Sequence, residues 1–169
     1  MKDYYYDSWI EDGTSPLGYR EIGPFKPVKT RTRKFADIAE GQDLPVIVQG
    51  PITRTDIVKY AGASWDFNPF HHDETFAKRS RAGGIIAHGM MVMGYLGRVA
   101  TAFLGTSEFD RFTARFKSVT HAGDTLRLEG HVKQATAQST GGIVVLALRA
   151  LNQRGELLAE GEVSATLSS

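Results

Sequence analysis

Apolar and polar residues alternate along much of the last third of the chain, which is the pattern of β-strands with one buried face. The alternation covers three stretches: Phe112–Lys117, Leu126–Lys133 and Val163–Leu167. A fourth stretch, Ile143–Leu148, is apolar throughout and predicts a strand buried on both faces at the centre of a sheet. Turn sequences at 122–124, 140–142 and 154–156 each contain glycine and predict successive antiparallel hairpins.

The middle of the chain carries a long apolar run instead. It reaches from Met90 to Leu104 and predicts a helix that begins near Gly89 and ends at Gly105. Because this helix lacks a continuous polar face, other structure must wrap it. One long buried helix followed by four antiparallel strands predicts an α+β fold in which a curved sheet encloses the helix. A thin sheet with open edges has reason to pair with a second copy, so we expect a homodimer or a dimer-based oligomer.

Two shorter elements are predicted upstream of this helix. Val46–Val48 should form a short strand that the following Gly-Pro pair ends. Thr53 precedes Asp56 by three residues, which is a capping-box pattern, and the helix that it starts should stop near Ser64. The segment 66–71 is therefore expected on a loop.

The first 32 residues lack sustained periodicity and are punctuated by six glycine or proline residues. We interpret residues 1–32 as an extension of a domain formed by residues 33–169. Tyr4–Tyr6 and Trp9 are too apolar to remain solvated without reason, so we expect the extension to pack on that domain.

Charge and composition exclude several classes of function. With 20 basic and 19 acidic side chains, the net charge of +1 gives no reason to expect a nucleic-acid surface. The absence of cysteine excludes disulfides, thiolate catalysis and cysteine-ligated metals. The longest apolar stretch, 83–104, is interrupted by His88 and Arg98 and is expected to be a buried helix, not a membrane span. The N-terminus has no apolar signal-peptide core, and we expect a cytoplasmic protein.

The segment from Ser64 to Asp73 is the richest in chemical groups. It places a carboxyl (Asp66), an amide (Asn68) and an imidazole (His71) within six residues, with a proline between them. Two proton-transfer groups and a hydrogen-bonding group on a stiffened turn form a plausible acid/base arrangement. The alternative is that Asp66 caps a turn and that Asn68 is ordinary turn chemistry.

A second segment adds backbone hydrogen-bond donors. Gly89 opens the apolar helix, where free backbone N–H groups can hold an oxyanion. Together the two segments predict chemistry beside a carbonyl. His88 is interpreted as a structural histidine at the helix start. No metal is expected, because His71 and His72 are adjacent, face opposite ways and have no evident third ligand.

The motifs resemble those of the MaoC-like dehydratases, the hot-dog-fold family that includes the (R)-specific enoyl-CoA hydratases. The resemblance covers about Arg33 to Leu167 and rests on four segments: Phe35–Pro45, Tyr60–Asp73 with its D-x-N-P-x-H pattern, Ile85–Met90 with its H-G-M, and Arg115–Leu126. It implies a hot-dog domain over 33–169 and a lyase that interconverts a trans-2-enoyl-CoA and a (3R)-3-hydroxyacyl-CoA. No cofactor is implied beyond the CoA or pantetheine of the substrate.

The resemblance also implies the roles of single residues. Asp66 and His71 match the catalytic pair, Asn68 the active-site amide, and Gly89 the backbone donor to the thioester oxygen. Trp65 stands where the family commonly has glycine, and we expect it to form a pocket wall with two phenylalanines, Phe67 and Phe70. Three alternatives remain open: a dehydratase acting on an acyl-carrier-protein thioester, a hot-dog thioesterase, and a non-catalytic acyl-thioester-binding subunit.

Overall fold

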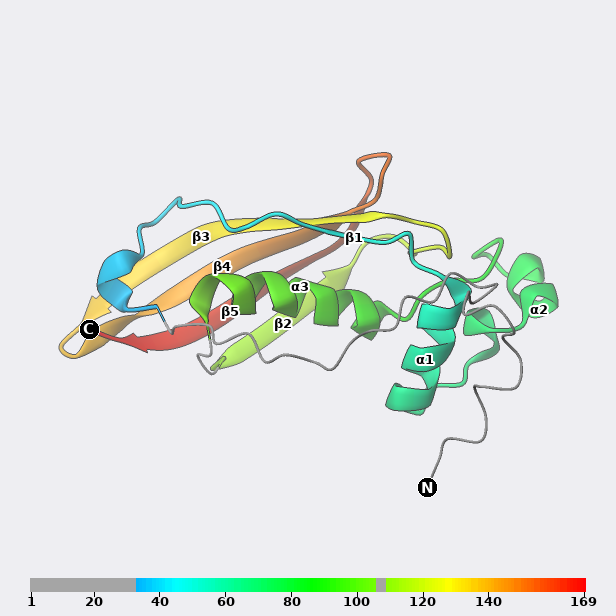
Figure 1. The fold of residues 1–169 in the computed structure, drawn as a ribbon, viewed down its shortest axis with the longest axis horizontal. Coiled ribbons are helices and arrows are strands. Elements are labelled where there is room, and N and C mark those ends of the chain that lie inside the picture. Colours follow the sequence, from blue (N-terminus) through cyan, green and yellow to red (C-terminus); the bar gives the residue numbers. More distant parts are fainter. Residues whose placement is uncertain (1–32, 106–108) are drawn as a thin grey trace, which may run out of the picture.

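The computed structural model describes residues 33–105 and 109–169, which form one long helix packed on one five-stranded antiparallel sheet (Figure 1). In chain order the elements are η1 (Phe35–Asp37), β1 (Ile47–Gln49), α1 (Arg54–Ser64), η2 (Pro69–His71), α2 (Glu74–Arg79), α3 (Gly89–Leu104), β2 (Arg111–Phe116), β3 (Leu126–Gln138), β4 (Gly141–Leu151) and β5 (Leu157–Ser168). This is the predicted α+β hot-dog fold. None of the described helices is long and apolar enough to cross a bilayer.

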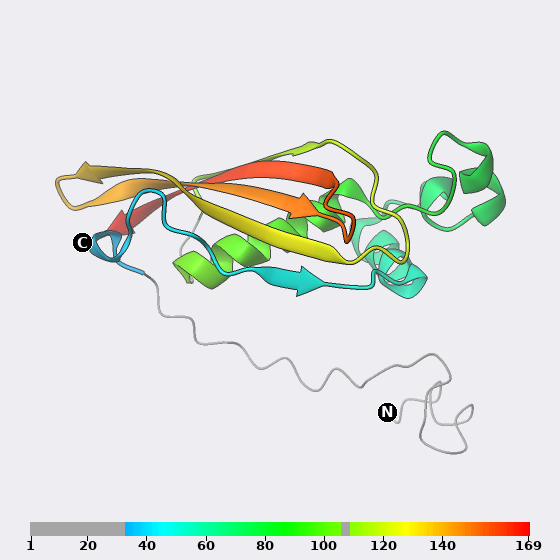
Figure 2. The same cartoon turned by 90° about the horizontal axis from the view of Figure 1, so that it is seen from above.

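The sheet has the strand order β1-β3-β4-β5-β2, so the all-apolar strand β4 lies in the centre, as predicted. Val144, Leu146 and Leu148 on one face of β4 are buried, whereas Ile143 and Val145 on the other face are half-buried. Figure 2 shows why, because α3 lies along one face of the sheet and leaves the other face without a helix.

The prediction of a hairpin at residues 122–124 is wrong. β2 pairs with β5, with Phe112 opposite Val163, and lies at the sheet edge opposite β1. β3 already has a neighbour on each side, β1 and β4, and therefore offers no free edge to β2. The two hairpins predicted farther along the chain, β3–β4 and β4–β5, are present.

The long helix α3 begins at Gly89 and ends before Gly105, as predicted, but the sheet covers only part of it. Leu96 and Phe103 are buried in the core, whereas Met90 is 57% exposed. Gly94 and Arg98 are also exposed and continue this open face at helical spacing. The packing predicted for residues 1–32 lies outside the described residues.

The helices α1 and α2 lie together at one end of the sheet (Figure 1). The predicted capping box starts α1, with the hydroxyl of Thr53 accepting from the N–H of Asp56 at 3.1 Å and the Asp56 carboxylate accepting from the N–H of Thr53 at 2.9 Å. Ile57 and Ala61 bury one side of α1. The turn that follows α1 is thereby held beside the N-terminal end of α3.

Candidate active site

The site begins where α1 ends in a tight turn. Trp65 adopts a left-handed conformation with φ 62°, which stops the helix. Oδ1 of Asp66 accepts a hydrogen bond from the N–H of Asn68 at 3.2 Å, and Oδ1 of Asn68 accepts one from the N–H of Phe70 at 3.2 Å. Both side chains thus make the turn contacts that their types favour. The other carboxylate oxygen, Oδ2 of Asp66, stays available to the site.

His71 lies in η2 and is 9% exposed. Its Nδ1 lies 2.7 Å from the backbone oxygen of Ile86, and because a carbonyl oxygen only accepts, Nδ1 carries the proton. The neutral ring then has its lone pair on Nε2, which lies 4.0 Å from Oδ2 of Asp66. His71 therefore presents a proton acceptor toward a carboxylate.

The separation of His71 Nε2 and Asp66 Oδ2, 4.0 Å, is too long for a direct hydrogen bond but suits a shared water. Such a water donates one hydrogen bond to each of these acceptors, and the two hydrogen bonds meet at the water oxygen at roughly a right angle. Its lone pairs then remain free to attack an electrophile. The pair is thus arranged to activate one water.

His88 holds both members of the pair from behind. It is 3% exposed, its Nε2 lies 3.0 Å from the backbone oxygen of Asp66, and its ring stacks on that of His71 with centroids 3.6 Å apart. It makes no side-chain cap on α3, so its structural role is to support the pair. The sequence signal for this was the H-G pair alone, which does not indicate the two contacts.

Gly89, the first residue of α3, borders a cavity of about 250 Å³ that His71 also lines. The backbone N–H of Gly89 has no acceptor among the described residues and lies at the positive end of the helix dipole. A Cβ on Gly89 would lie 3.1 Å from the ring of Phe116, so any side chain here requires that ring to shift. The cavity therefore brings together a proton acceptor and an unused N–H donor.

Metal binding does not fit this geometry. Ligand atoms of Asp66, His71 and His88 lie within 4.8 Å of one another. The two imidazole planes, however, are stacked at 21° with centroids 3.6 Å apart, so their lone pairs lie in two nearly parallel planes and do not converge on one ion. The adjacent residues have other partners, since Nε2 of His72 bonds the backbone oxygen of Phe67 at 3.0 Å and Asp73 caps α2.

The three aromatic residues expected to form a pocket wall do not line this cavity. Trp65 is 83% exposed and contacts Phe67 edge to face, with ring centroids 5.5 Å apart. Phe70 packs against Phe76. Their proposed contact with substrate stays a prediction.

A larger concavity, about 1100 Å³, lies on the outer face of the sheet, away from these residues. The Glu129 carboxylate there is bound by Arg127 and by Arg149, each at 2.6 Å. Arg127, Glu129 and Arg149 thus pair with one another, and none of the predicted site residues lines this concavity.

A comparison with protein families matches the "MaoC like domain" over residues 36–150. The chain belongs to this family. The match includes the turn, the N-terminal end of α3 and all of the residues that line the cavity except Leu158.

Named relatives of this MaoC-like domain are hydratases and dehydratases. An (R)-specific enoyl-CoA hydratase from Rhodospirillum rubrum is 34% identical over 98 residues, 54% of this chain and 64% of that protein. A mitochondrial 3-hydroxyacyl-[acyl-carrier-protein] dehydratase from Solanum lycopersicum is 25% identical over 68% of this chain and 69% of that protein. Among solved structures, the R-hydratase PhaJ1 from Pseudomonas aeruginosa has a TM-score of 0.71 and 27% identity, covering 80% of this chain and 86% of that one.

Proposed function

We propose that the protein is a hydro-lyase that adds water reversibly to a trans-2-enoyl-CoA and forms a (3R)-3-hydroxyacyl-CoA. The observation that carries the proposal is the pairing of His71 Nε2 with Asp66 Oδ2 at 4.0 Å, beside a cavity that the N–H of Gly89 borders. The names of the relatives support the same reaction class. CoA is part of the substrate, and the reaction uses no further cofactor.

The proposed step balances with the residues of the site. The shared water loses a proton to His71 as its oxygen bonds C3, and the C2–C3 π electrons move onto the thioester oxygen. The Gly89 N–H stabilises the resulting enolate oxygen. The enolate then returns its electrons to C2 and takes up there the proton that His71 received from the water, with the Asp66 carboxylate as the partner that accepts and returns this proton on the way. His71 and Asp66 thus end the step in the states in which they began it. Asn68 keeps the turn in place and orients this pair.

The acyl-carrier-protein dehydratase is the second candidate, because the tomato relative carries that name and pantetheine is common to both thioesters. The acid/base pair favours hydration over thioester hydrolysis, and its presence also argues against a non-catalytic binding subunit. These readings separate in one experiment. Crotonyl-CoA and the matching carrier-protein thioester are offered in parallel, while loss of the enoyl group and release of free thiol are recorded.

The catalytic pair is tested by substitution. Asp66→Asn and His71→Ala should each lower kcat for crotonyl-CoA hydration at least about a hundredfold, the usual contribution of a positioned acid or base. His131→Ala is the matched control, because His131 is an exposed histidine on β3 that does not line the cavity. Near-native turnover in either site variant, or an equal loss in the control, would contradict the proposal.

A further inference from the structure

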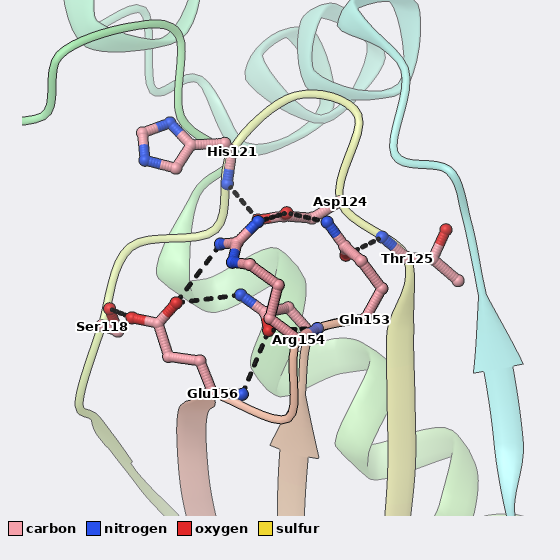
Figure 3. Close-up of polar contacts among 8 residues, drawn as sticks. Ser118, His121, Asp124, Thr125, Gln153, Arg154 and Glu156 are labelled. Carbon is pink, nitrogen blue, oxygen red and sulfur yellow. Dashed lines mark hydrogen bonds and ion pairs between the residues drawn. The ribbon is translucent and has the colours of Figure 1, made fainter.

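One buried carboxylate outside the catalytic pair joins two loops beside the cavity (Figure 3). Asp124 is 3% exposed. Its Oδ2 accepts from the backbone N–H of His121 at 2.8 Å, and its Oδ1 accepts from Nε2 of Gln153 at 2.9 Å. Nη1 of Arg154 lies 3.6 Å from the same Oδ1. A buried charge is costly without such partners, so these contacts fix His121 relative to the β4–β5 turn.

The β4–β5 turn is itself held rigidly. Oδ1 of Asn152 accepts from the N–H groups of Arg154 and Glu156 at 3.0 and 3.1 Å. The hydroxyl of Ser118 donates to the Glu156 carboxylate, and this bond, followed by those from Asn152 and Arg154, holds the pKa of Glu156 below its usual range. The turn thus holds the segment 118–125 in a fixed position.

The segment held by Asp124 binds the backbone strip Ile85–Ala87, which lies between this segment and the catalytic turn. The N–H of Ala87 donates to the oxygen of Thr120 at 2.7 Å, and the N–H of Ala122 donates to the oxygen of Ile85 at 3.2 Å. These two bonds flank the bridge between Ile86 and His121. The strip therefore takes its position from the loop that Asp124 closes.

The other edge of the strip faces the catalytic histidine. The N–H of Ile86 donates to the oxygen of Phe70 at 3.2 Å, and the oxygen of Ile86 accepts from Nδ1 of His71 at 2.7 Å. Moving the loop moves this acceptor, and the acceptor decides which ring nitrogen of His71 carries the proton. Ser118, Val119 and Thr120 of the same loop also line the cavity.

We propose that Asp124 is a positioning residue for His71. Asp124 holds the 118–122 loop, and this loop holds the carbonyl of Ile86 that accepts from His71. Asp124 touches neither the cavity nor the catalytic pair. The inference deepens the proposed function and rests on it for the role of His71.

The first test reads the tautomer of His71 without any turnover. In protein labelled with nitrogen-15 histidine, the ring shifts of His71, assigned by their loss in His71→Gln, should show one tautomer with the proton on Nδ1. Asp124→Asn keeps the size of the side chain but has a single acceptor oxygen, so it cannot satisfy both His121 and Gln153. In this variant we expect the His71 shifts to move toward a mixture of tautomers.

The second test is kinetic and uses a matched control. Asp124→Asn should lower kcat on crotonyl-CoA by about tenfold to a hundredfold, the effect of a misplacement near 1 Å, with a smaller change in KM. Val144→Ala destabilises the buried centre of β4, away from the loop, and should lower Tm while both the His71 shifts and kcat stay as in the wild type.

The outcomes separate this inference from the proposed function. A folded Asp124→Asn protein with unchanged His71 shifts overturns the inference about Asp124. The inference is also overturned if Val144→Ala changes the His71 shifts as much as Asp124→Asn does. If Asp124→Asn does not fold, Gln153→Leu removes one of the two donors, and an unchanged His71 spectrum there overturns it as well. Absent turnover in the wild type refutes the proposed function alone, since the tautomer is still measured.

Discussion

Gly89→Ala tests the backbone donor that no side-chain deletion can remove. The new methyl would lie 3.1–3.2 Å from three carbon atoms at the edge of the Phe116 ring, closer than ordinary van der Waals contact. Phe116 is 46% exposed, so its ring can swing outward. That movement changes the wall of the cavity beside the N–H of Gly89.

The effect on stability should be small. Alanine gains about 0.4–1 kcal/mol over glycine through the unfolded chain, and crowding in a packed site costs about 1–3 kcal/mol when nothing can move. Because Phe116 is able to move, we expect the free energy of unfolding to change by less than about 1 kcal/mol. A thermal melt measures this change directly.

The effect on catalysis should be large. Loss of one oxyanion donor costs on the order of a hundredfold to a thousandfold in kcat, and partial displacement should cost at least about tenfold. Gly94→Ala is the matched control, since it lies on the same helix and its Cβ would meet nothing within 4 Å. The control should raise the free energy of unfolding by about 0.5–1 kcal/mol and keep full activity. Turnover of Gly89→Ala equal to that of Gly94→Ala would refute the role of the Gly89 N–H.

Three further predictions address assembly, pH and the exposed indole. The open sheet edges predict a homodimer with the cavity near the subunit boundary, and light scattering that shows only an 18.6 kDa particle across dilution would contradict it. The pKa of Glu156 is lower in the folded protein than its unfolded value of 4.5, so ionised Glu156 stabilises the fold above that pH. This stabilisation is lost as the pH falls through the folded pKa. The Tm difference between wild type and Glu156→Gln should therefore be present at neutral pH and vanish in acid. A difference that persists in acid would contradict that sign. Trp65→Gly removes about 1–2 kcal/mol of left-handed strain and adds about 0.5–1 kcal/mol of chain entropy, so Tm should barely change. The ratio of kcat/KM between long and short acyl-CoA substrates should rise in this variant, and an unchanged ratio would show that the indole forms no pocket wall.

The local parts of the site were predictable from the sequence because they depend on residues close together in the chain. Asp66 and His71 lie within six residues of each other, and the capping box at Thr53 indicated where the helix before them begins. The start of α3 at Gly89 followed from the apolar run that begins there, and its end followed from Gly105.

The long-range parts were not predictable in the same way. Alternation indicated that β2 is a strand, but it does not specify a neighbour, and the pairing with β5 is decided by which sheet edge is free. The acceptor for His71 is a backbone oxygen 15 residues away, at Ile86, and a carbonyl has no residue-type signal. The buried position of Asp124 likewise depends on partners from the distant β4–β5 turn.

The strip Ile85–Ala87 has a consequence for how this protein can vary. Ile86 binds the turn 66–71 through its backbone, since its N–H donates to the oxygen of Phe70 and its oxygen accepts from Nδ1 of His71. Exchange of one aliphatic side chain for another at this position should therefore leave the proton on the same ring nitrogen. Proline at Ile86 would delete the donor to Phe70, and one inserted or deleted residue would replace the carbonyl that faces His71 by one that faces away. At Ile86 an aliphatic exchange should therefore disturb the site less than a change of length. The spacing between the turn 66–71 and α3 is thus under tighter constraint than the identity of the side chain at Ile86.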